Sequence, residues 1–186
     1  MTLFSFFISF VCIVSASIVS ARPSAREACG EGGVVLNTTM ILHEGKEFTL
    51  TSKSCPNFVA SNATVSKPAD DIVFCDSWSC SIVCLDLGAQ PLLVDCHIIE
   101  SMLNAEPAGT YFTAAPGTIS SISYNSCAYA FANGDTVTYN PCYAFLSQTG
   151  DLVSSVCFGA YPTGTYTAGG ACLRDDSNWY LEAYHP

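Results

Sequence analysis

The chain has 186 residues, 49% of them hydrophobic and only 12% charged, with a formal net charge of −10 at pH 7. From Cys75 to the C-terminus the only basic side chain is Arg174, against ten carboxylates. Nucleic-acid affinity comes mainly from Lys and Arg neutralising phosphates, so this balance argues against a nucleic-acid partner and, for the same reason, against anionic lipid. The sequence pI of about 4.3 suits a mildly acidic medium.

Residues 1–21 have the pattern of a secretory signal peptide. Residues 2–18 are mostly apolar and uncharged, and Val19-Ser20-Ala21 is a small-residue cleavage signal. The alternative is an uncleaved membrane anchor. A membrane span needs about 20 apolar residues, and serines interrupt the end of this run. We therefore expect a secreted, extracellular protein with no membrane span after signal cleavage.

Cleavage removes Cys12 from the eleven cysteines and leaves an even number. An even count in a short exported chain predicts a disulfide framework of up to five bridges. Zinc sites use close thiolate pairs such as C-x-x-C, and none occurs here, so we expect no metal and no cofactor. The predicted half-cystines are Cys29, Cys55, Cys75, Cys80, Cys84, Cys96, Cys127, Cys142, Cys157 and Cys172.

Residues 22–73 form a predicted β-rich segment and linker, treated as an appendage to a main domain at 74–186. Apolar runs flank Gly45 in a short polar gap, which is a hairpin signal. Cys29 and Cys55 bracket this hairpin, and we expect them to pair. Asn37 and Asn62 begin N-glycosylation sequons.

The main domain is organised around a predicted amphipathic helix at 90–103. Leu92, Cys96, Ile99 and Leu103 recur with helical spacing and form one apolar stripe. Asp95 and His97 fall outside this stripe, and their spacing points them in different directions.

Strands are predicted at 109–113, 118–124 and 127–132. Asn133-Gly134 is a strong hairpin signal, from which 136–139 would return antiparallel. Asn140-Pro141 begins a predicted second helix that ends at Cys157, weakened in its middle by Gly150. A hairpin at 169–172 and 178–184 closes the fold, with one core face and one exposed face. The core face carries Trp179, Leu181 and Ala183, and the exposed face Tyr180, Glu182 and Tyr184.

This order of elements predicts an α+β fold, an antiparallel sheet with two helices packed on one face (an α/β sandwich) and stapled by disulfides. The residues expected in its core lie on the apolar face of each element. They are Leu92, Ile99, Phe131, Phe145 and Trp179.

Several motifs resemble those of small secreted cysteine-rich fungal proteins. The helix at 90–99, the Gly109-Thr-Tyr-Phe run and the strand at 124–131 resemble the necrosis-inducing effector domain, itself similar to smut-fungus killer toxins. The ending at 169–186 is more similar to a mushroom branch of secreted proteins that includes a glycan-binding lectin. The resemblance covers residues 75–186 and implies an α/β sandwich.

No catalytic constellation is recognisable. The chain has no G-x-S-x-G turn, and Asp175 and Asp176 are adjacent in a predicted turn, whereas a glycosidase needs two carboxylates across a cleft. We therefore predict a non-enzymatic protein, effector- or toxin-like, that binds an extracellular glycan or a cell-surface protein of a host or competitor. The alternatives are a mushroom-type lectin and a structural cell-wall protein. Tyrosine suits binding loops because it offers contact area for little rotamer entropy. The candidate binding residues are Tyr161, Tyr166, Asn178, Tyr180 and Tyr184.

Overall fold

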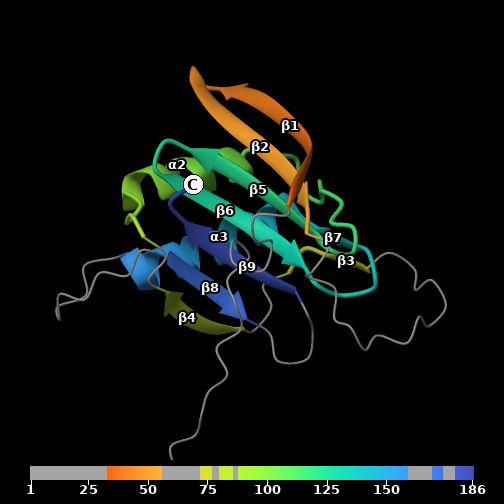
Figure 1. Cartoon of the computed structure of the whole chain (residues 1–186). Coiled ribbons are helices and arrows are strands. Elements are labelled where there is room, and N and C mark those ends of the chain that lie inside the picture. Colours follow the sequence, from red (N-terminus) through yellow and green to blue (C-terminus); the bar gives the residue numbers. More distant parts are fainter. Residues whose placement is uncertain (1–32, 56–71, 77–79, 86–87, 159–168, 174–178) are drawn as a thin grey trace, which may run out of the picture.

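The computed structural model describes residues 33–55, 72–76, 80–85, 88–158, 169–173 and 179–186. A seven-stranded antiparallel sheet forms the centre of the molecule, in the order β1-β2-β5-β6-β9-β8-β4 (Figure 1). Its strands are β1 (Val34–His43), β2 (Lys46–Ser54), β4 (Ser81–Leu85), β5 (Thr118–Tyr124), β6 (Cys127–Asn133), β8 (Gly169–Leu173) and β9 (Trp179–Tyr184). The predicted α+β class is confirmed.

The N-terminal appendage expected from the sequence is a β1–β2 hairpin that turns at Glu44 and Gly45. Both residues have positive φ, 51° and 74°, and glycine adopts such values without steric cost. β2 pairs along six residues with β5, from Thr49 opposite Ser123 to Ser54 opposite Thr118. The hairpin therefore extends the main sheet, with β1 at its edge (Figure 1).

Two antiparallel helices pack on one face of the sheet. Helix α2 (Leu93–Asn104) lies over β5 and β6, and α3 (Tyr143–Phe158) lies over β4, β8 and β9. Most of the predicted core is confirmed, because four of the five residues are fully buried between these layers: Ile99, Phe131, Phe145 and Trp179.

Leu92 is the exception and is 61% exposed. It lies before the first helical turn, with extended backbone angles (φ −79°, ψ 124°), so its side chain does not join the stripe formed by Cys96 and Ile99. The prediction that it belongs to the core is wrong, because helical periodicity applies only from Leu93 onward.

The prediction of a hairpin at Asn133-Gly134 is also wrong. Neither residue has the positive φ that a type I′ turn requires, and β9 rather than 136–139 pairs with the second edge of β6. The buried Asn133 amide instead donates to the carbonyl oxygens of Ala114 (2.8 Å) and Val137 (2.9 Å). These two bonds hold the loop against the end of β6.

The chain after this loop forms β7 (Tyr139–Pro141), which pairs in parallel with β3 (Ile72–Phe74) in a separate two-stranded sheet. Helix α3 therefore begins at Tyr143, two residues after Pro141, and continues unbroken through Gly150. The predicted strand at 109–113 is reduced to an isolated bridge between Tyr111 and Cys142.

The face of the sheet away from the helices is buried at its centre. Tyr180 is 4% exposed and Glu182 1%, so the expectation that both lie on an exposed face is wrong. Tyr180 packs there with Ile119 and with the small side chains of Ala130 and Ala132. Strand β9 lies inside the sheet, between β6 and β8, which gives its side chains neighbours on both sides.

Four disulfides have both partners in the described residues: Cys75–Cys142, Cys80–Cys172, Cys84–Cys157 and Cys96–Cys127. The last two tie the helices α3 and α2 to the sheet. Cys55 is also disulfide-bonded, and its predicted partner Cys29 lies outside the described residues. Every cysteine in the part of the chain that the structure describes is therefore oxidised, as the even count predicted. No helix within this described part is long and apolar enough to cross a membrane.

Candidate functional site

A pocket of about 150 Å³ lies where the β1–β2 turn meets helix α2. The hairpin supplies one wall and α2 the other. The position follows from β2 pairing with β5, because α2 covers β5 and the turn projects beside it. The lining residues are His43, Glu44, Lys46, Phe48, Val94, His97, Ile98, Ser101 and Met102.

The pocket combines an apolar floor with a polar rim. Phe48 and Met102 are buried in the main core, and Ile98 packs against it. Two of the three histidines in the chain, His43 and His97, stand at the rim with one of its six basic side chains. Glu44 also lines the pocket, so the rim gathers Lys46, two imidazoles and one carboxylate in a protein of net charge −10. Such a pocket can bind a small ligand or side chain whose apolar part lies on the floor and whose polar end contacts the rim.

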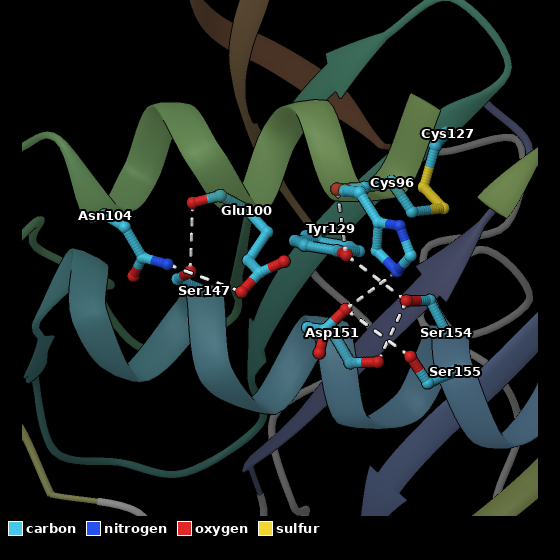
Figure 2. A network of polar contacts seen from close by, with 10 residues as sticks. Cys96, Glu100, Asn104, Cys127, Tyr129, Ser147, Asp151, Ser154 and Ser155 are labelled. Carbon is cyan, nitrogen blue, oxygen red and sulfur yellow. Dashed lines mark hydrogen bonds and ion pairs between the residues drawn. A yellow bond between two sulfur atoms is a disulfide. The ribbon is translucent and has the colours of Figure 1, made fainter. Parts of the chain in front are cut away.

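A polar network between α2 and α3 holds the α2 wall in place (Figure 2). The buried Tyr129 hydroxyl, from β6, donates to the carbonyl oxygen of Cys96 at 3.1 Å and lies 3.3 Å from Ser154 Oγ. Ser147 Oγ donates to the carbonyl oxygen of Glu100 at 3.1 Å. Burial raises the pKa of Tyr129 far above its ordinary value, so its hydroxyl stays protonated and remains a donor.

His97 also contacts α3, with its Nε2 3.3 Å from Asp151 Oδ1. Ser155 Oγ donates to that same oxygen at 3.4 Å. A serine nucleophile must instead be hydrogen-bonded to the imidazole, which takes its proton. The three side chains therefore have the composition of a hydrolase triad but the wrong connectivity. The Asp151 carboxylate positions the ring of His97 at the edge of the pocket.

The first turn of α2 is anchored by Asp95, which is buried although the sequence places it off the apolar stripe. Its carboxylate accepts bonds from Ser126 Oγ (2.6 Å), Ser126 N (3.2 Å) and Asn125 Nδ2 (3.3 Å) in the β5–β6 turn. Burial acts to raise the pKa of Asp95, but these hydrogen bonds outweigh it and the net shift is downward. As predicted, Asp95 and His97 point to different neighbours.

Of the five sequence-predicted binding residues, only Tyr180 and Tyr184 lie in the part of the chain that the structure describes. Tyr161, Tyr166 and Asn178 lie outside the described residues, as does the sequon at Asn62. Tyr180 is buried, Tyr184 is half-buried, and Asn37 is exposed on β1. The role of the first three in binding stays a prediction.

Sequence reasoning missed the contribution of the hairpin turn to the pocket. The signal was the titratable cluster at 43–47 around Gly45, which served only to place the turn. Nothing local indicates that this turn lies beside His97, because 54 residues of chain and one strand pairing separate His43 from it.

No group of three or more His, Cys, Asp or Glu side chains within the described ranges could hold a metal ion. Comparison of the chain with protein-family models, with curated proteins and with solved structures finds no match.

Proposed function

We propose that this chain is a secreted, non-enzymatic binding protein that acts in the manner of an effector or toxin and recognises a protein on the surface of a host or competitor cell. The pocket between the β1–β2 turn and α2 is its recognition site. The observation that supports this proposal is the composition of that pocket, an apolar floor with His43, Lys46 and His97 beside Glu44 at its rim, in a molecule of net charge −10.

The scaffold supports this proposal. Disulfides that close long loops restrict the unfolded chain and suit a small protein to the extracellular medium. The four bridges with both partners in the described residues have sequence separations from 31 to 92, and two of them, Cys84–Cys157 and Cys96–Cys127, join the sheet to a helix. The α2 wall is held by the Cys96–Cys127 bridge and by the Tyr129 hydroxyl. A preformed wall lowers the entropy cost of binding.

The chemistry of the rim favours one kind of anchor. A side chain that is apolar near its root and carries a carboxylate at its tip would fill the floor and meet Lys46 and the histidines. Acidic groups elsewhere on this protein would repel such a partner, so the rim is where it would be attracted. The expected epitope is therefore an exposed acidic segment flanked by apolar residues.

The test compares a variant of the pocket rim with a variant of the same hairpin outside the pocket. Lys46→Ala with His97→Ala removes two rim groups, whereas Lys53→Ala removes one lysine from an exposed position on β2 outside the pocket. Labelled mature proteins are titrated onto living cells, with circular dichroism to confirm folding. We expect the rim variant to bind at least about tenfold more weakly, a loss of about 1.4 kcal/mol, and Lys53→Ala to bind like the parent protein. Equal binding by all three would refute the pocket as the site.

Glycan recognition remains the second candidate from the sequence, and burial of Tyr180 removes one of its proposed stacking rings. A glycan array probed with deglycosylated protein separates the two candidates. Saturable binding to defined sugars, lost in a Tyr161→Ala and Tyr166→Ala double variant, would support the lectin. Absence of sugar binding together with saturable cell binding supports the protein-directed proposal.

A further inference from the structure

Strand β1 forms a long apolar edge of the sheet. It has ten residues, and within the described ranges no strand pairs with its outer side (Figure 1). The opposite edge, β4, has only five. Natural edge strands are usually short or carry charges or proline, because an open ladder of N–H and C=O groups pairs readily with another strand. β1 is long and carries no proline, Asp, Glu, Lys or Arg, and its one irregularity is a register shift against β2 between Val35 and Asn37. Its exposed large side chains, between 53% and 75% accessible, are Val34, Val35, Leu36, Met40 and Leu42.

The charge distribution isolates this edge from the acidic remainder of the molecule. Residues 33–55 contain two lysines and two glutamates, so the hairpin is formally neutral, and β1 contains no Asp, Glu, Lys or Arg. From Cys75 onward the chain carries ten carboxylates and one arginine. Two copies of this protein would repel one another over most of their surfaces. They can approach closely at the hairpin without placing like charges opposite each other.

The sequence of β1 is self-complementary when the strand is reversed. Three apolar residues (34–36) and three apolar residues (40–42) flank the polar segment 37–39. Antiparallel pairing with a second β1, centred with Thr38 opposite Thr38, places polar residues opposite polar ones and apolar residues opposite apolar ones. Such an arrangement has the two-fold symmetry of an isologous interface.

We propose that two copies of this chain form a symmetric dimer by antiparallel pairing of their β1 strands, which joins the two sheets into one. The pairing satisfies the open ladder of each edge and shields the exposed side chains of both hairpins. It also places the two pockets, each beside one β1–β2 turn, at opposite ends of the joined edge. The dimer would therefore present two equivalent sites to a cell surface, but its formation does not depend on the proposed function.

Asn37 lies within the proposed interface and begins a sequon, so a glycan there would oppose pairing. The test therefore uses the full mature chain with Asn37→Gln, which keeps a polar amide and prevents glycosylation. Sedimentation velocity over a wide concentration range measures its dimer dissociation constant. Met40→Lys with Leu42→Lys, added to this background, places charges on the edge. Leu152→Lys, at a 51% exposed leucine on α3, is the matched control.

We expect a concentration-dependent dimer in the Asn37→Gln protein and in the Leu152→Lys control. The Met40→Lys and Leu42→Lys changes should raise the dissociation constant at least about tenfold. Hydrogen exchange on the Asn37→Gln protein provides a measurement that needs no lysine variant. Amides of β1 should gain protection as the concentration rises, while those of β4 should not. A monomer at every concentration, or a dimer unaffected by the charged edge and without added β1 protection, would overturn the proposal.

Discussion

Replacing Gly150 by alanine should destabilise the protein, although the same change in most helices stabilises it. A Cβ built at this position lies 2.6 Å from Cε2 and 2.7 Å from Cγ of Tyr129. That ring is fully buried, and its hydroxyl is bonded to the Cys96 carbonyl and close to Ser154. Because the buried ring is fixed at its hydroxyl as well as through its Cβ, it cannot swing away to make room. Gly150 permits α3 to approach β6 at this point.

Two opposing effects determine the magnitude. In an exposed helix interior, alanine is favoured over glycine by about 1 kcal/mol. Overpacking a filled core costs about 1–3 kcal/mol, and contact with several atoms of one restrained ring belongs at the upper end of that range. We therefore expect a net loss of about 1–2 kcal/mol in the free energy of unfolding. For a chain of this size the melting temperature falls roughly 2–4 °C for each kcal/mol.

Urea unfolding with the disulfides intact, followed by circular dichroism, measures this change. Gln148→Ala, at an exposed position in the same helix, controls for general effects of substitution in α3 and should shift stability by less than about 0.5 kcal/mol. Tyr129→Leu removes part of the ring, so in that background Gly150→Ala should become less costly or favourable. A stabilising Gly150→Ala in the parent protein would refute the close approach.

Asp95→Asn should cost about 1–3 kcal/mol at neutral pH, because it weakens three hydrogen bonds to a buried carboxylate. Since the folded pKa of Asp95 lies below its ordinary value of 3.8, its contribution is present above that value and is lost as the pH falls through the folded pKa. The difference in unfolding free energy between parent and variant should therefore shrink in acid, and a constant difference would contradict this reading. Ile99→Ala should cost about 2–5 kcal/mol in the same urea assay, because the side chain is fully buried, and a change under about 0.5 kcal/mol would be typical of a surface site. Mass spectrometry of the unreduced mature protein after treatment with an alkylating reagent should show no modified cysteine, and a modified Cys55 or Cys96 would contradict the disulfide assignment.

Much of the fold follows from local patterns in the chain. The hairpin at Gly45 was predictable because a glycine in a short polar gap between apolar runs is a turn signal by itself. The helix at 93–104 was predictable from its apolar stripe, which also identified Ile99 as buried. The α+β class then followed from the order of strands and helices. Each of these inferences depends on residues within about one element of one another.

The errors arise where distant segments compete for the same partner. Asn133-Gly134 is a strong local turn signal, but β9 occupies the edge of β6 that a hairpin would need, and the Asn133 amide bonds to Ala114 instead. Alternation in β9 predicted an exposed Tyr180, but β9 lies between two other strands, where the small alanines of β6 leave space that the ring fills. Neither neighbour can be identified from the sequence of the element itself.

In the candidate site, too, some features follow from the sequence and others only from contacts between distant segments. The sequence alone determined which chemical groups are available, namely few basic side chains, three histidines and an oxidised cysteine framework. Only the tertiary structure decided that His43 and Lys46 meet His97 over an apolar floor, and that β1 rather than β4 is the long open edge. The reason is that both features depend on the pairing of β2 with β5, a contact between segments about 70 residues apart. Periodicity and turn chemistry act within an element, whereas strand order is set by which complete arrangement buries the most apolar surface and pairs the most backbone groups.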